Sequence, residues 1–320
     1  MTTINSFKEL GLAPLLLLFP IPSLLFGPRR RFVLLLGLVG IGLLWGSFVD
    51  VSRLIDEGRA FIFLDVFSTS TGVPISLLSF ISFFGPVIGI ALGFDSINGE
   101  RTQGTLSRLL AQPIYRDSVF NAKLLAAILT LSLVVASVMM VVVGVTMFRL
   151  GIPPTPEEIL RLVGFYSVTM MYLSFWLALS ITTSVLFRNT VTSALASIGA
   201  WFSLGFLVTL FGGVIADRIV PEIKVSADAI RHLSIESWIN RVSPSGLFSE
   251  ATTILLDPMG GRALNFFSID QSRLSGLLST PVSAVQSLQL IWPHIVVLLG
   301  MVALLIALSY LKFMREEIRA

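Results

Sequence analysis

Long, uninterrupted runs of apolar residues constrain the fold of this chain more than any other feature. A helix needs about 20 residues to cross the roughly 30 Å hydrocarbon core of a bilayer. Five runs meet this length, and a sixth, at residues 32–49, is slightly shorter but carries no charge. The six runs occupy residues 32–49, 75–94, 124–148, 162–187, 190–216 and 290–311. The sequence therefore predicts an all-α polytopic membrane protein with six transmembrane helices.

The composition agrees with this prediction, because 54% of the residues are hydrophobic and only 13% are charged. Soluble domains carry about 25% charged residues, which they need to cover their surface. The basic residues are scattered near the ends of the apolar runs and form no continuous stripe, so the net charge of +3 does not indicate a nucleic-acid partner. Membrane lipid is the expected surrounding.

The distribution of lysine and arginine predicts the orientation, since cytoplasmic loops are enriched in both. With the N-terminus inside, the cytoplasmic segments hold twelve basic and six acidic residues, against ten and thirteen outside. We therefore expect residues 1–31 and 312–320 in the cytoplasm, spans one to five within residues 32–216, and a large extracytoplasmic helical segment at 217–289. The proline-rich stretch 11–27 is interpreted as an interfacial elbow, with a seventh span as the alternative.

Several classes of enzyme and carrier lack their required residues in this sequence. There is no cysteine, the only two histidines are His232 and His294, and neither a G-x-x-x-x-G-K-[ST] nor a G-x-S-x-G motif occurs. We therefore expect no catalytic, cofactor or metal site in this chain. Among ionisable groups other than tyrosine, the six predicted spans hold only His294, which is typical of an interfacial or hydrogen-bonded residue. Such spans argue against an ion-coupled carrier.

Small residues share one helical face in the second predicted span and again in the fifth. The positions singled out as candidates for the wall of a translocation path are Ser79, Ser82, Gly89, Ser193 and Ser197. The alternative is close packing of helices through small residues. The spacing alone does not separate these two interpretations.

A polar stretch between the second and third spans interrupts the apolar pattern. Gly104 and Thr105 can begin a helix in which Leu106, Leu109 and Leu110 form one apolar stripe, and Pro113 ends it. One interpretation is an interfacial helix that anchors the loop. The other is a docking helix whose leucines enter a groove on a cytoplasmic partner.

The same stretch resembles the signature of the ABC-2 type permease family, E-x-x-x-G-T-L-x-x-L-L-x-x-P-x-x-R with a later G-K. The matching positions are Glu100, Gly104, Thr105, Leu106, Leu109, Leu110, Pro113, Arg116 and Lys123. Ala122 departs from the pattern, because the family usually has glycine before the lysine. Residues 184–195 and 310–319 resemble further parts of the family, and the chain resembles the group that includes the nitrous-oxide-reductase maturation permease.

The resemblance implies one transmembrane half of an ABC exporter in the cell membrane. It would pair with a second permease subunit, identical or related, and with separate ATPase subunits that bind ATP and Mg. The segment 104–113 would be the coupling helix, with Glu100 beside it, and spans two and five would line the path. The 217–289 segment would receive cargo or an extracytoplasmic partner. The alternatives are an ion-coupled carrier or channel and a membrane scaffold for an assembly pathway.

Overall fold

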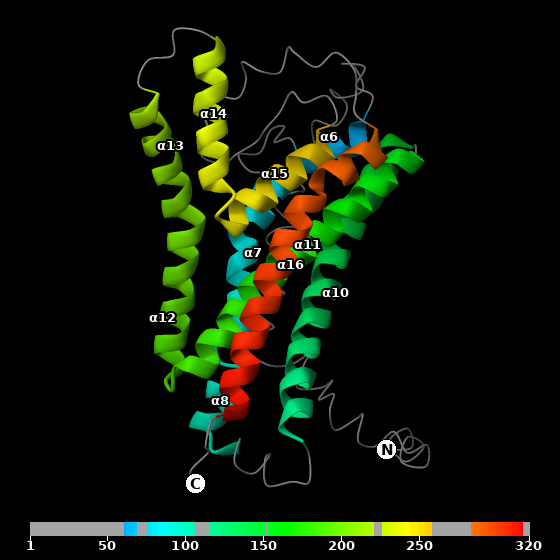
Figure 1. Cartoon of the computed structure of the whole chain (residues 1–320). Coiled ribbons are helices and arrows are strands. Elements are labelled where there is room, and N and C mark those ends of the chain that lie inside the picture. Colours follow the sequence, from blue (N-terminus) through cyan, green and yellow to red (C-terminus); the bar gives the residue numbers. More distant parts are fainter. Residues whose placement is uncertain are drawn as a thin grey trace.

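The structure, a computed structural model, describes residues 61–68, 76–105, 115–151, 153–220, 226–257 and 283–315 (Figure 1). Within these residues it is helical and contains no strand. Five helical stretches are long and apolar enough to cross a membrane: Leu77–Thr102, Arg116–Arg149, Pro156–Leu186, Thr190–Ile219 and Ala284–Arg315. They coincide with the last five predicted spans, and the chain is an all-α polytopic membrane protein. The predicted first span and the elbow lie outside the described residues.

Helix α11 (Pro156–Leu186) forms the centre of the bundle. It contacts α7 (Leu77–Gly93), α10 (Arg116–Leu150) and α16 (Ala284–Arg315) along its length. Trp176, Tyr172 and Phe165 of α11 are among the largest fully buried side chains. The sequence of α11 is apolar on nearly every face, which is typical of a helix surrounded by other helices.

The helices extend beyond the apolar runs that predicted them. Helix α11 begins at Pro156 rather than 162, because Thr155 and Glu158 form a reciprocal capping box and proline occupies the first turn. Helix α10 continues to Leu150, where Gly151 ends it with a φ of 68°, a left-handed conformation that favours glycine. Polar first and last turns are therefore part of these helices, although a criterion of hydrophobicity omits them.

The fifth predicted span is one continuous helical rod made of three segments. Helix α12 (Thr190–Trp201) leads into a π-helical segment, η2 (Phe202–Leu207), and then into α13 (Val208–Ile219). In Figure 1 this rod stands beside the central helices, and only 6% of its most apolar window is buried within the chain. The π-helical segment was not predicted, because its residues are as apolar as their neighbours.

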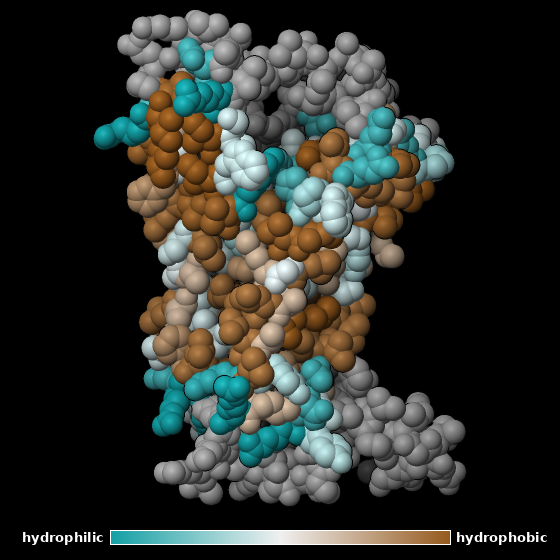
Figure 2. Space-filling view, in the orientation of Figure 1, coloured by the Kyte–Doolittle hydropathy of each residue, from teal (hydrophilic) through white to brown (hydrophobic). Residues whose placement is uncertain are grey.

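The predicted helical segment after this rod contains two described helices, α14 (Ser226–Asn240) and α15 (Pro244–Leu256). Helix α14 contacts α13, and α15 crosses α11 and α16 near the short helix α6 (Ile62–Ser68). We call this the α15 end of the bundle. The opposite end carries α8 (Asn98–Thr102) and is called the α8 end. On the face in Figure 2, polar residues gather toward the two ends and apolar residues cover the middle.

Candidate functional site

An ion pair at the α8 end joins two residues of the predicted signature. Glu100 Oε1 in α8 lies 2.7 Å from Lys123 Nζ in α10. Lys123 Nζ also donates to the carbonyl oxygen of Ser96, between α7 and α8. The two charged side chains are 34% and 22% exposed, so the pair is partly shielded from water. These contacts hold the two flanks of residues 106–114 against each other.

Two of the remaining described signature positions, Gly104 and Thr105, contact α8 beside this ion pair, and the third, Arg116, begins α10. Gly104 ends α8 with a φ of 66°, and its N–H donates to the carbonyl oxygen of Arg101 at 3.1 Å. The Thr105 hydroxyl donates to the carbonyl oxygen of Glu100 at 3.2 Å. Arg116 is exposed and begins α10. The other four predicted positions, Leu106, Leu109, Leu110 and Pro113, lie outside the described residues.

The predicted path residues of the second span lie on α7. Gly89 packs directly against α11, because a methyl group added there would lie 3.0 Å from the Leu173 carbonyl oxygen. Ser79 bonds to Ser76 in the first turn, and the Ser82 carbonyl accepts from the Tyr172 hydroxyl at 2.8 Å. Gly89 therefore belongs to a close helix contact, as the packing interpretation expects. A role in a path stays a prediction for all three positions.

The predicted path residues of the fifth span, Ser193 and Ser197, are fully buried near the α8 end. The Ser193 hydroxyl donates to the carbonyl oxygen of Phe94 at 2.7 Å, and the Ser197 hydroxyl lies 2.6 Å from that of Thr183. Both serines therefore join α12 to its neighbours α7 and α11. Their part in a translocation path also stays a prediction.

A comparison with family models decides the family. The model described as "ABC-2 family transporter protein" matches residues 15–318 of the 320-residue chain. The chain belongs to the ABC-2 transporter family. Among the curated proteins no match was found.

Membership makes this ABC-2 protein a permease of an ABC-type transporter and a multi-pass membrane protein. ABC-2 permeases are transmembrane components without an ATPase site of their own, which agrees with the missing P-loop motif. The family implies an ABC ATPase as partner and, typically, a dimeric permease. The likeness to the nitrous-oxide-reductase maturation group stays a prediction.

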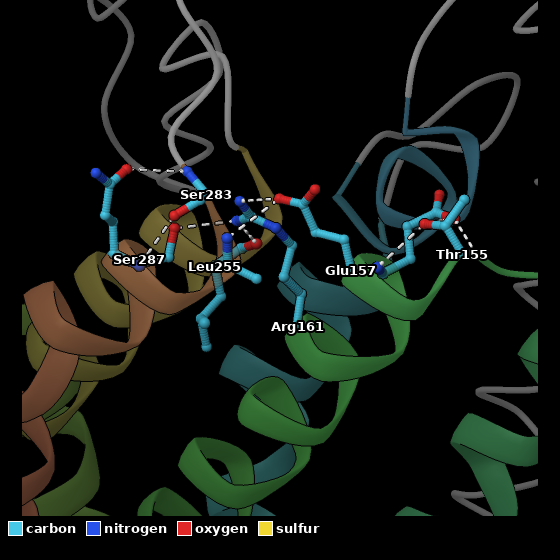
Figure 3. A network of polar contacts seen from close by, with 9 residues as sticks. Thr155, Glu157, Arg161, Leu255, Ser283 and Ser287 are labelled. Atoms are coloured by element: carbon cyan, nitrogen blue, oxygen red, sulfur yellow. Dashed lines mark hydrogen bonds and ion pairs between the residues drawn. The ribbon is translucent and has the colours of Figure 1, made fainter.

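A second polar cluster of the ABC-2 permease lies at the α15 end around Arg161, which is fully buried (Figure 3). Arg161 Nη1 donates to the Leu255 carbonyl oxygen at 2.9 Å and to the Ser287 hydroxyl at 3.1 Å. Its Nη2 lies 3.1 Å from Glu157 Oε1. The guanidinium therefore supplies donors to the last turn of α15, where helix carbonyls lack intrahelical partners and a positive charge is favourable.

The two glutamates of this cluster serve other helix ends. Glu157 Oε1 accepts from the backbone N–H of Ala284, the first residue of α16, at 3.1 Å. Glu158 accepts from the N–H of Phe63 in α6 at 3.2 Å and also caps α11 through Thr155. Side chains from one turn and a half of α11 thus satisfy the ends of four helices. Arg161 was not predicted as a site residue because it precedes the apolar run, although the capping signal at Thr155 predicts a helix that includes it.

A third cluster at the α15 end joins α14, α15 and α16. Arg241 Nε donates to Glu250 Oε2 at 2.8 Å, and His294 Nε2 lies 3.0 Å from the same oxygen. His294 therefore lies against the Glu250 carboxylate at this end of the bundle. Burial acts to raise the pKa of Glu250, but the hydrogen bonds with Arg241 and His294 outweigh it and lower the pKa to about 2.

Proposed function

We propose that this permease is the membrane-spanning half of an exporter driven by a separate ATPase subunit, which binds ATP and Mg. The observation that carries the proposal is the ion pair between Glu100 and Lys123. It closes the base of the segment that contains the predicted coupling helix. Because the segment is fixed at both flanks, a displacement imposed by a bound partner would be transmitted to the spans rather than lost in local bending of the segment.

The contacts of Lys123 indicate which spans would receive that push. Lys123 lies in the second turn of α10, and its second bond is to the Ser96 carbonyl oxygen, just after α7. Movement of residues 104–115 would therefore act on α7 and α10 together. In this proposal the α8 end faces the cytoplasm, in agreement with the excess of basic residues predicted there.

A second permease subunit, identical or related, completes the proposed transporter. The rod of α12, η2 and α13 buries little of itself within the chain and exposes large apolar side chains, among them Leu195, Phe202 and Phe211. We propose that part of this surface meets the second subunit and part meets lipid. The partly exposed Ser79 and Ser82 of α7, rather than charges, would border a path between the subunits, which suits a weakly polar cargo.

The test is to measure ATP hydrolysis by the permease alone and with its ATPase. The purified chain in nanodiscs is expected to hydrolyse no ATP. Co-expression with a P-loop ATPase subunit should give a stable complex whose hydrolysis rate differs from that of the ATPase alone. A variant of the ATPase with its P-loop lysine replaced by alanine serves as the control. The proposal would be refuted if the purified permease hydrolysed ATP by itself and the rate were the same whether the wild-type ATPase or the P-loop variant was added.

A further inference from the structure

Hydroxyl side chains gather at the α8 end where α7, α8, α11 and α12 meet. They belong to Ser180, Thr183, Ser184, Ser193 and Ser197, and the four serines are fully buried. Helix α7 and α11 approach closely here, because a methyl group added to Gly93 would overlap the hydroxyl of Ser180. Buried hydroxyls need partners, and in this cluster most of the partners belong to a different helix.

Ser184 of α11 holds the beginning of α8. Its Oγ accepts from the backbone N–H groups of Ile97 and Asn98, each at 3.2 Å. Ile97 is the N-cap residue of α8 and makes no side-chain capping bond itself. Because both residues are at most 1% exposed, water cannot replace this acceptor. A side chain from a neighbouring span therefore does the work that a capping residue normally does within its own helix.

The same cluster continues from α11 to α12. The Ser193 hydroxyl in the first turn of α12 donates to the Phe94 carbonyl oxygen at the end of α7 at 2.7 Å, and its oxygen lies 3.1 Å from Thr183 Oγ1. The Thr183 hydroxyl in turn lies 2.6 Å from that of Ser197, one turn further along α12. Helix α8, the end of α11 and the beginning of α12 are thus connected through short polar contacts.

We propose that Ser184 is a positioning residue that transmits movement of α8 to α11 and, through Ser193, to α12. This inference rests on the proposed function, because the movement of α8 originates in the ATPase that docks beside it. The ion pair of Glu100 fixes the middle of α8 to α10, and Ser184 fixes its beginning to α11. Helix α8 therefore acts as a short lever between the docking segment and the two spans.

The first test uses the permease alone in nanodiscs and measures amide hydrogen exchange in peptides that cover residues 95–103. Ser184→Ala removes the acceptor, and exchange at Ile97 and Asn98 should become about tenfold faster. Ser184→Thr keeps the hydroxyl and should stay close to the wild-type rate. Ser309→Ala is the matched control, because that serine is buried in α16 and donates to Ile306 of its own helix. Unchanged exchange in Ser184→Ala would overturn the inference.

The second test adds the ATPase and compares retention with permease-dependent ATP hydrolysis. We expect Ser184→Ala to retain the ATPase on affinity purification but to lose most of the permease-dependent change in hydrolysis rate, with rescue by Ser184→Thr. Ser309→Ala should behave like the wild type. If Ser184→Ala retained the ATPase and also showed the wild-type permease-dependent change in hydrolysis rate, the proposed role of Ser184 would be wrong, and the proposed function would stand. Failure of the wild-type permease to retain any ATPase would overturn the proposed function as well.

Discussion

Glu100 Oε1 and Lys123 Nζ lie 2.7 Å apart, although 22 residues separate them in the chain, so the ion pair joins the two sides of residues 104–115, which we propose as the docking segment for the ATPase. Lys123 makes a further bond to Ser96, and Thr105 folds back onto Glu100. The two ends of the segment are therefore fixed relative to α7 and α10. This arrangement gives the spacing of Glu100 and Lys123 in the signature a physical purpose, because their ion pair joins α8 to α10.

The ion pair should matter for binding of the ATPase. Glu100→Gln or Lys123→Met should each weaken that binding, because the docking segment loses its fixed base. Partly exposed ion pairs contribute about 1 kcal/mol, which corresponds to about fivefold in affinity. The measurement is a titration of purified permease variants with the ATPase. Combining Glu100→Lys with Lys123→Glu should recover part of the loss.

The control for this prediction is Lys312→Ala, since Lys312 is an exposed basic residue near the α8 end of α16. It should bind the ATPase with nearly the wild-type affinity. The account would be contradicted if the permease carrying both Glu100→Lys and Lys123→Glu bound the ATPase no better than Glu100→Gln or Lys123→Met.

Arg161 should be among the residues most important for the stability of the permease. Arg161→Ala leaves the Leu255 carbonyl oxygen and the Ser287 hydroxyl without their buried donor. Removing one partner of a buried charged network costs about 3–5 kcal/mol in the free energy of unfolding. Arg149→Ala, at an exposed arginine near the same end of the bundle, should change it by about 0.5 kcal/mol or less. Equal unfolding curves for the two variants in detergent would show that the Arg161 cluster does not stabilise this end.

Acid should remove the contribution of Glu250 to stability. Burial alone would raise the pKa of this carboxyl. Its interactions with Arg241 and His294 have the larger effect, and the net result is a pKa lowered from 4.5 to about 2. Because the folded-state pKa is depressed, the stabilisation is complete above the unfolded-state value and declines as the pH falls from about 4.5 toward 2. The difference in unfolding free energy between the wild type and Glu250→Gln should therefore shrink as the pH falls below about 4.5.

A decline that is complete before the pH falls to 5 would contradict this assignment, because the depressed pKa of Glu250 places its loss below about 4.5. A difference that stays constant down to pH 3 would also contradict it. The measurement needs detergent micelles that remain intact across this range.

The orientation can be tested with single cysteines, since the chain has none of its own. We expect a cysteine at Arg231, exposed on α14, to react with an impermeant maleimide added to intact cells. A cysteine at Gln103, exposed at the end of α8, should react only after the membrane is permeabilised. The reverse pattern would place the docking segment outside and remove the basis for coupling to an ATPase.

The sequence predicted the spans well because membrane-crossing helices are selected by apolar length alone. It located their ends less well, since the ends depend on capping residues such as Thr155 and Gly151 rather than on hydrophobicity. The burial of Arg161 was missed for the same reason. An arginine just before an apolar run usually marks the membrane boundary, and only the helices that cover it here make it a buried residue.

The candidate site shows a similar division. The signature identified Glu100 and Lys123 one by one, but the contact between them depends on how α8 turns back toward α10. The hydroxyls of Ser193 and Ser197 were recognised as a small-residue face, whereas their partners Phe94 and Thr183 lie on other helices. Spacing along one helix carries no information about such partners.

Replacement of Leu109 tests the central claim most directly. Leu109 lies outside the described residues, and its place in the predicted apolar stripe comes from the sequence. If the stripe fills a groove on the ATPase, Leu109→Asp buries an unpaired carboxylate and should weaken ATPase binding roughly thirtyfold to a thousandfold. Arg108→Ala, on another side of the predicted helix, should matter much less. The account predicts loss of the copurifying ATPase from monodisperse Leu109→Asp permease, whereas unchanged copurification and an unchanged hydrolysis rate would contradict it.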